Sequence, residues 1–200
     1  MAAIAKRKTR EREYLQRILI VHEGEETENK YIQHVKHLYG IERKCRIEMY
    51  HPKHTSISAM IQKMNQEAGY VDSRDCFWIV LDRDEGNHKL DQFEELAQWE
   101  KDSSQHHVAI STPRFEYWLL LHVMEHPGGV SAKTDNYVEQ HIPGYTKDLR
   151  NCLGVFTKNS VDQAIERAET QGVPTCIAPD KVGSGVGRML CLFKRLADNY

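Results

Sequence analysis

The 200-residue sequence predicts an α/β fold in which helices flank a mostly parallel β-sheet. Short apolar segments alternate along the chain with segments of helical periodicity. Two of the apolar segments, residues 18–21 and 76–81, contain no charged residue, which is typical of parallel strands buried on both faces. The length and a hydrophobic content of 40% suit one compact domain over residues 17–200, after a basic arm at residues 1–16.

The first half of the chain predicts two strand–helix units. Residues 17–24 predict a strand, and residues 27–39 predict a helix that ends at Gly40. Residues 45–50 alternate polar and apolar side chains, which predicts a second strand, and residues 57–68 place their apolar side chains on one helical face. This order predicts parallel strands joined by right-handed crossovers.

The same alternation continues to about residue 125. Residues 75–81 predict a central strand, and residues 89–101 predict the helix that follows it. Residues 107–110 predict a short strand, and residues 114–125 predict a long apolar helix. Functional residues of such a sheet lie beyond the carboxyl ends of its strands.

The last third of the chain is less regular. Residues 127–154 are rich in Gly, Pro, Asp and Lys, which predicts a loop or a small insertion. Residues 160–171 predict a helix and residues 175–178 a short strand. A closing helix is expected at residues 187–196, after the Gly-rich segment 182–187.

Charge is unevenly distributed although its total is almost balanced, with 27 basic and 29 acidic residues. Residues 1–20 carry six basic and two acidic side chains, and residues 82–102 carry eight acidic and three basic ones. A basic arm that follows a phosphate backbone and an acidic cluster that holds metal are one interpretation. A solvated tail and a solvated helix fit the charge pattern equally well.

Cysteine and histidine spacing argues against two kinds of site. The five cysteines have no CxxC or paired spacing, so neither a disulfide framework nor a structural zinc site is indicated, and no HxH or HExxH motif groups the eleven histidines. There is no signal-peptide core and no run of about 18 apolar residues. We therefore expect a cytoplasmic protein with no membrane partner. The sequence leaves the quaternary structure open, and we expect a homodimer because it is the commonest assembly of soluble oligomers.

Carboxylates follow two of the predicted strands. Asp82 and Asp84 come directly after the apolar segment that ends at residue 81, and Glu23 with Gly24 ends the first strand. Spacing of two in extended backbone points both aspartates the same way, and hard oxygen donors suit Mg²⁺ or Mn²⁺. Gly24 permits the close backbone approach that a phosphate needs. Capping of the following helices is the structural alternative for both groups.

These strand ends resemble a known pattern. A strand ending in Glu-Gly and a later strand ending in Asp-x-Asp is similar to the Toprim pattern of topoisomerases, primases and OLD-type nucleases. Within that group the chain resembles the RloB family over about residues 17–147. The segment 182–188 departs from that family, which usually has a Pro- and Ser/Thr-containing segment before its final helix. The blocks that carry the resemblance are EGEETENKY at 23–31, LDRDE at 81–85, STPRFEYWLLLH at 111–122 and YTK at 145–147.

The resemblance implies a Toprim-like, Rossmann-like fold and a set of site residues. Glu23 is implied as the general acid/base or a metal-binding carboxylate, and Asp82 and Asp84 as ligands of Mg²⁺ or Mn²⁺. Glu28 and Glu116 fall in the matching blocks and are further candidate ligands. RloB-like proteins are found beside restriction and abortive-infection loci, often with an ATPase companion.

Glu116 and Lys147 have both functional and structural interpretations. Glu116 lies in a helix that is apolar on nearly every side, where a charge is expected to be paired or functional, although it also suits a helix start. His122 in the same helix is interpreted as a satisfied, semi-buried histidine. Arg114 and Lys147 lie near predicted loops, where cations stabilise charge on a phosphoryl transition state, and a solvated lysine is the alternative for Lys147.

Two functions from different classes follow. The first is a metal-dependent nuclease that hydrolyses phosphodiesters of DNA or RNA, tRNA included, in antiphage defence with an ATPase companion. The second is a non-catalytic signalling or assembly module whose carboxylates bind metal or nucleotide. The joint presence of Glu23, Asp82 and Asp84 favours catalysis. The chain is too short for a covalent topoisomerase and lacks the template-binding and zinc modules of a primase.

Overall fold

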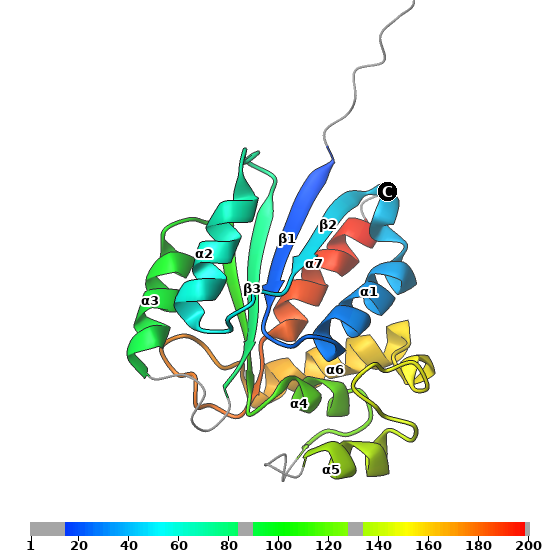
Figure 1. The fold of residues 1–200 in the computed structure, drawn as a ribbon. Helices are drawn as coiled ribbons and strands as arrows, with labels where there is room; N and C mark the ends of the chain where they lie inside the picture. Colours follow the sequence, from blue (N-terminus) through cyan, green and yellow to red (C-terminus); the bar gives the residue numbers. More distant parts are fainter. Residues whose placement is uncertain (1–14, 84–89, 128–133, 199–200) are drawn as a thin grey trace, which may run out of the picture.

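A five-stranded sheet forms the centre of the molecule (Figure 1). The computed structural model describes residues 15–83, 90–127 and 134–198. The strand order is β2-β1-β3-β4-β5, in which the first four strands are parallel and β5 is antiparallel to β4. The predicted α/β class with a mostly parallel sheet is therefore confirmed. The strands are β1 (Gln16–His22), β2 (Cys45–Tyr50), β3 (Cys76–Asp82), β4 (His106–Thr112) and β5 (Gly183–Ser184).

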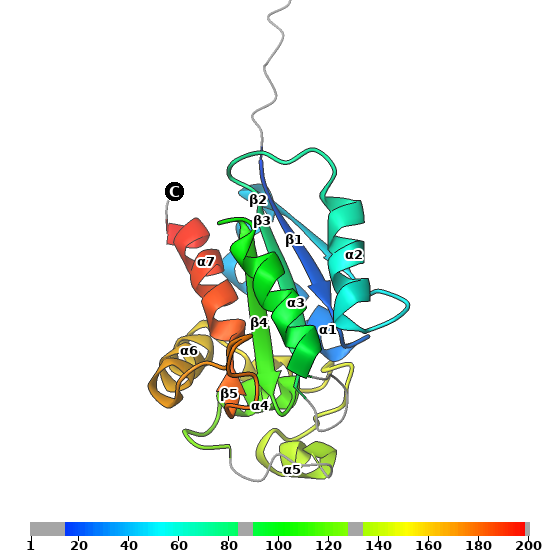
Figure 2. The same ribbon diagram turned by 90° about the vertical axis from the view of Figure 1, so that its left-hand side faces the viewer.

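Helices cover both faces of this sheet (Figures 1 and 2). One face packs against α2 and α3, and the other against α1, α4 and α7, so each face has its own apolar cluster. The crossover order explains this placement, because each parallel pair needs a helical connection across one face. The helices are α1 (Thr27–Tyr39), α2 (Ile57–Ala68), α3 (Leu90–Lys101), α4 (Phe115–Leu120), α5 (Thr134–His141), α6 (Lys158–Gln171) and α7 (Val186–Asp198), with short 3₁₀ turns at Ile41–Arg43 and Leu153–Val155.

The structure differs from the sequence prediction in the last third of the chain. The predicted strand at residues 175–178 is wrong, because this stretch forms turns, and the fifth strand forms instead inside the Gly-rich segment at Gly183–Ser184. Gly185 next to it donates its N–H to the Ile110 carbonyl at 2.8 Å. A Cβ at this position would lie 3.1 Å from the Ala109 Cα, so the absence of a side chain allows the close approach.

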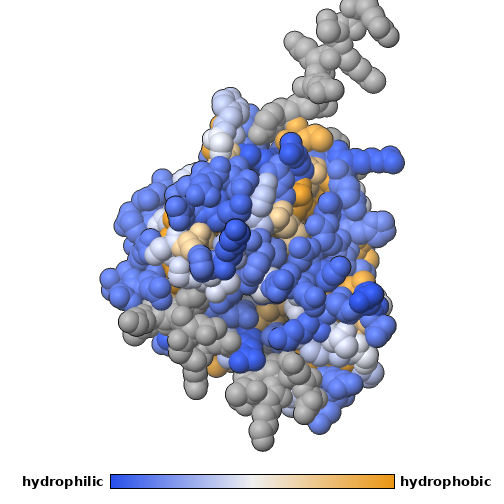
Figure 3. Space-filling model, viewed as in Figure 1, coloured by the Kyte–Doolittle hydropathy of each residue, from blue (hydrophilic) through white to orange (hydrophobic). Residues whose placement is uncertain are grey.

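Two other segments also differ from expectation. The long helix predicted at residues 114–125 ends as α4 at Leu120, and only turns follow it. The stretch predicted as loop contains α5 and a 3₁₀ turn. Much of the molecular surface in the view of Figure 3 is hydrophilic, with apolar residues in small patches. In the described part of the chain, no helix combines the length and apolarity needed to span a membrane.

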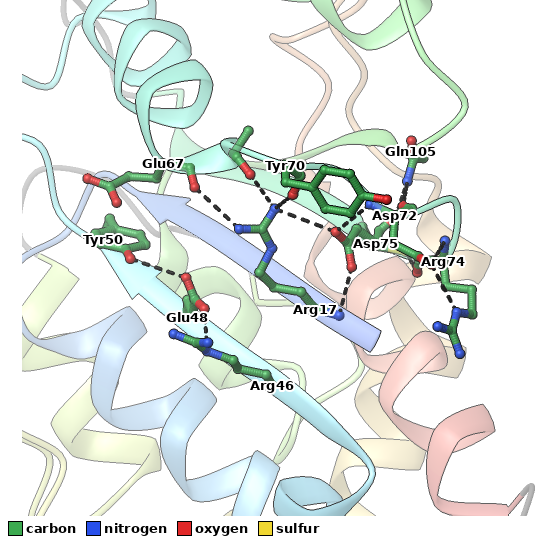
Figure 4. A network of polar contacts seen from close by, with 12 residues as sticks. Arg17, Arg46, Glu48, Tyr50, Glu67, Tyr70, Asp72, Arg74, Asp75 and Gln105 are labelled. Atoms are coloured by element: carbon green, nitrogen blue, oxygen red, sulfur yellow. Dashed lines mark hydrogen bonds and ion pairs between the residues drawn. The ribbon is translucent and has the colours of Figure 1, made fainter. Parts of the chain in front are cut away.

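A buried ion pair fixes the amino edge of the sheet (Figure 4). The Asp75 side chain is fully buried, accepts the Arg17 backbone N–H at 3.0 Å and pairs with the Arg17 guanidinium at 3.5 Å. The same guanidinium donates to three backbone carbonyls. Glu67 and Ala68 are the last two residues of α2, and Tyr70 follows shortly after them. The network therefore ties α2 to β1 and β3 at the edge where β1 and β3 begin.

Removing the Asp75 charge should destabilise the fold. We expect Asp75→Asn to lower the free energy of unfolding by about 3 kcal/mol, because the Arg17 guanidinium, whose side chain is only 15% exposed, then loses its anionic partner. Urea denaturation of Asp75→Asn and of the exposed control Asp102→Asn measures this difference. A loss no larger than that of the control, expected within about 0.5 kcal/mol, would show that the pair is dispensable.

Candidate functional site at the carboxyl edge of the sheet

The carboxyl ends of β1 and β3 meet at one edge of the sheet. The two strands are parallel neighbours in which His22 lies beside Val80, and the Glu23 backbone N–H donates to the Val80 carbonyl at 3.0 Å. The Glu23 carboxylate Oε2 accepts the Asp82 backbone N–H, also at 3.0 Å. The structure thus brings Glu23 and Asp82 together, as the strand-end pattern predicts. Asp84 lies outside the described residues.

Asp82 points to the sheet face that α1 and α4 cover. Trp78 and Val80 belong to the apolar cluster on this face, and Asp82 follows Val80 at a spacing of two. Glu28 in the first turn of α1 and Glu116 in the first turn of α4 lie on the same side. The end of β3 and the starts of α1 and α4 therefore direct carboxylates toward the same side of the carboxyl edge.

Each of the two helical glutamates is held by a neutral donor. Glu28 is 3% exposed, and its Oε1 accepts the Gly24 backbone N–H at 3.0 Å. A Cβ at Gly24 would lie 1.8 Å from the other Glu28 oxygen, so Glu28 needs a glycine there. Glu116 is 8% exposed, and its Oε1 accepts the Tyr145 hydroxyl at 2.8 Å.

These side chains line a cavity of about 350 Å³, and two basic side chains line it as well. The basic side chains are those of Arg114, which precedes α4, and the exposed Lys147. The Thr27 hydroxyl donates to the Lys147 carbonyl at 3.0 Å and so fixes the backbone of the Lys147 segment against α1. The cavity is lined by Gly24, Glu25, Glu26, Thr27, Glu28, Asp82, Arg114, Phe115, Glu116 and Lys147.

The carboxylates of this cavity repel one another. Burial, followed by the charges of Glu28, Glu116 and Glu23, raises the pKa of Asp82 well above its ordinary value, although a hydrogen bond from the Phe115 backbone N–H opposes the shift. Burial is also the main cause that raises the pKa of Glu28 to about 7, and Glu116 and Glu23 add to it. Such a cluster stabilises the protonated forms unless a cation compensates the charge.

The donor set suits a divalent cation. Glu23, Glu28, Asp82 and Glu116 offer carboxylate oxygens, the ligands that Mg²⁺ and Mn²⁺ prefer. Within the described ranges, no three His, Cys, Asp or Glu side chains are grouped closely enough to hold a metal by themselves. A magnesium site does not require such a group, because Mg²⁺ usually keeps several waters and binds one or two carboxylates.

Two neighbouring histidines have structural roles. His22 is buried, a condition that lowers its pKa, and its neutral ring donates from Nδ1 to the Gly24 carbonyl at 2.7 Å. Burial lowers the pKa of His122 to about 3, so its neutral ring donates to the Trp118 carbonyl and accepts the Tyr31 hydroxyl, as expected for a satisfied histidine. No sequence pattern indicated the role of His22, and Tyr145 could be found only through its Tyr-Thr-Lys block.

Comparison with protein families decides where the chain belongs. The model of the RloB-like protein family matches residues 18–187. The chain is a member of the RloB-like family. The match continues past residue 147 into the Gly-rich segment, so this RloB-like chain follows its family further than the short blocks indicate. No curated protein and no solved structure matches it.

The buried Glu28 should make stability depend on pH. Its folded-state pKa of about 7 lies above the ordinary value of 4.5, so the folded protein binds the proton more tightly and the free energy of unfolding falls as pH rises from about 4.5 to about 7. We expect Glu28→Gln in metal-free buffer to be more stable than the wild type at pH 8, by up to about 3 kcal/mol. Denaturation at pH 5 and pH 8 measures both effects.

The exposed Glu94 on α3 provides the matched control. Glu94→Gln removes one carboxylate from a solvated helix face and should leave the difference between pH 5 and pH 8 unchanged. If Glu28→Gln and Glu94→Gln showed the same pH dependence as the wild type, the Glu28 carboxylate would not carry the shift.

Proposed function

We propose that this RloB-like protein is a Toprim-like nuclease that requires Mg²⁺ or Mn²⁺ and hydrolyses phosphodiesters of DNA or RNA, with tRNA as one candidate. The observation that carries the proposal is the hydrogen bond between Glu23 and the Asp82 backbone at the shared end of β1 and β3, with Glu28 and Glu116 beside it. We further propose a role in antiphage defence with an ATPase companion, on the resemblance alone. A cytoplasmic location, based on the cysteine spacing, and a homodimer are additional proposals.

Each proposed residue has a role that its position supports. Glu23 and Asp82 would hold the metal from adjacent strand ends, with Glu28, Glu116 and, by sequence, Asp84 as further ligands. A bound divalent cation supplies Lewis-acid activation of water and charge neutralisation on the phosphoryl group. Arg114 and Lys147 line the same cavity and would attract the phosphate, whose charge the carboxylates otherwise repel.

Proton transfer belongs to the carboxylates in this proposal. Glu23 is the proposed general acid or base, and its Oε2 is oriented by the Asp82 N–H. A positioned carboxylate can exchange a proton with the attacking water or the leaving oxygen when it lies within hydrogen-bond reach. Glu116 would act as a further metal ligand or position metal-bound water, with its Oε1 held by the Tyr145 hydroxyl.

The Asp82→Asn variant tests the nuclease function. We expect it to reduce cleavage by about 100-fold or more with Mg²⁺ or Mn²⁺, because loss of a ligand carboxylate costs at least as much as loss of a supporting residue. Melting temperature should not fall, since the substitution relieves repulsion with Glu28, Glu116 and Glu23. Labelled single-stranded DNA, duplex DNA and tRNA are the substrates, and Asp102→Asn is the control. Equal cleavage by Asp82→Asn and wild type would refute the assignment.

Glu116→Gln separates a metal-site role from a helix-capping role. Glutamine keeps the oxygen that accepts the Tyr145 hydroxyl but removes the charge, so the fold should persist. We expect Mn²⁺ affinity, measured by calorimetry, to fall by about 10- to 100-fold, with a melting temperature close to that of the wild type. Unchanged Mn²⁺ affinity together with a large loss of stability would make Glu116 a structural cap.

A non-catalytic metal- or nucleotide-binding module is the second candidate. In this function, the carboxylates and the two basic side chains that line the cavity hold a metal ion or a nucleotide without cleaving a nucleic acid. This function predicts that wild type binds Mn²⁺ or a nucleotide but cleaves none of the labelled nucleic acids. The cleavage assay with Asp82→Asn therefore distinguishes the two functions.

A further inference from the structure

A second pocket at the carboxyl edge of the sheet is basic. It has a volume of about 400 Å³ and lies between the β2–α2 loop and the exposed face of α2. The loop contributes His51, Lys53 and His54. The helix contributes Gln62, Lys63 and Gln66, whose spacing places them on one face. The pocket thus combines basic groups with amide donors, and none of its lining residues, all of which are described, carries a carboxylate.

The two lysines of this pocket differ in their partners. Lys63 pairs with Glu67 at 2.5 Å and lies over the Tyr50 ring, so its charge is partly compensated. Lys53 is exposed and has no ion-pair or hydrogen-bond partner among the residues that the structure describes. An anion entering the pocket would therefore meet one uncompensated ammonium and a second that is oriented by a neighbouring ring.

The pocket lies one strand away from the carboxylate cavity. β2 pairs with β1 in parallel, with Tyr50 beside Val21, so the β2–α2 loop leaves the sheet next to Glu23. The His51 ring donates from Nδ1 to the His22 carbonyl at 3.4 Å, which connects the loop to the end of β1. Helices α1 and α2 cover opposite faces of the sheet (Figures 1 and 2). The acidic cavity, lined by the start of α1, and the basic pocket, lined by α2, therefore lie on the two sides of the β1 tip.

We infer that this basic pocket binds backbone phosphates of the same nucleic-acid strand whose phosphodiester enters the carboxylate cavity. The inference rests on the proposed nuclease function and adds a substrate-binding surface to it. The strand would cross the β1 tip, with one phosphate near Arg114 and Lys147 and a neighbouring segment against Lys53 and Lys63.

The negative charge of the carboxylate cavity makes such a surface necessary. Glu28, Asp82 and Glu116 line the proposed cleavage cavity, and Glu23 accepts a hydrogen bond from the Asp82 backbone beside it. A polyanion gains little affinity there, so cations and amide donors outside the cavity must supply it, as they do for most backbone recognition. The pocket offers both kinds of donor on the adjacent strand connection.

Binding of fluorescent 20-nucleotide DNA and RNA strands by full-length protein tests the inference. Anisotropy is measured in Ca²⁺ and in EDTA over a range of salt concentrations, so that affinity is read separately from Mg²⁺-dependent cleavage. We expect Lys53→Gln/Lys63→Gln to bind about tenfold more weakly and to lower the salt slope by about 1.4, or about 0.7 for each lost phosphate contact. The single variant Lys53→Gln changes only an exposed loop residue and should show about half of this slope change.

The control removes two charges from the opposite edge. Arg43, just before β2, and Lys101, at the end of α3, are exposed at the amino edge of the sheet. The variant Arg43→Gln/Lys101→Gln should therefore bind the strands like the wild type. Comparison of the affinities for DNA and RNA strands shows whether binding depends on the phosphates alone or also on the 2′-hydroxyl of the sugar.

The outcomes separate this inference from the nuclease proposal. Weaker binding and a lower salt slope for the pocket variants, but not for the control, support the inference even if no cleavage is seen. If the wild type binds and cleaves while the pocket variants keep its affinity and slope, the pocket is overturned and the nuclease stands. If the wild type binds neither the DNA strand nor the RNA strand, the inference is overturned, and the cleavage assay with duplex DNA and tRNA decides the nuclease proposal separately.

Discussion

The parallel pairing of β1 with β3 is the constraint on which the site depends. It ends two strands at the same level of one edge, where the Glu23 carboxylate can accept the Asp82 N–H. The helices that follow β1 and β4 then begin near that point, and Glu28 and Glu116 occupy their first turns. The carboxylate cluster is therefore a consequence of strand order rather than of any one loop.

This arrangement stores repulsion that the rest of the fold must offset. Burial and mutual charge raise the pKa of Asp82 and Glu28, so the cavity lowers stability at neutral pH in the absence of a cation. The opposing contributions lie elsewhere, in the two apolar clusters and in the Arg17–Asp75 ion pair at the other edge of the sheet. The Arg17–Asp75 ion pair and the carboxylate cluster thus lie at opposite ends of β1 and β3.

Local signals decided how much of the structure could be predicted. The bounds of β2, α1 and α2 agree with the sequence prediction because periodicity and a clear stop or cap, such as Ser56 before α2, coincide there. The fifth strand could not be placed, since residues 183–184 form a strand only by contact with the edge of β4. Glu23 and Asp82 were found because parallel strand ends converge. The bond from Tyr145 to Glu116 joins segments whose proximity no local pattern encodes.

The hydrogen bond between Thr27 and Lys147 affects the order in which parts of the cavity form during folding. These residues are 120 positions apart, so their hydrogen bond closes one of the longest loops in the chain. Loop closure of this length has an entropic cost that contacts within β1–α1 or α2 do not have. During synthesis, the strands that carry Glu23 and Asp82 emerge well before residue 147 does. A nascent chain therefore holds its carboxylates before the lysine that completes the cavity can join them.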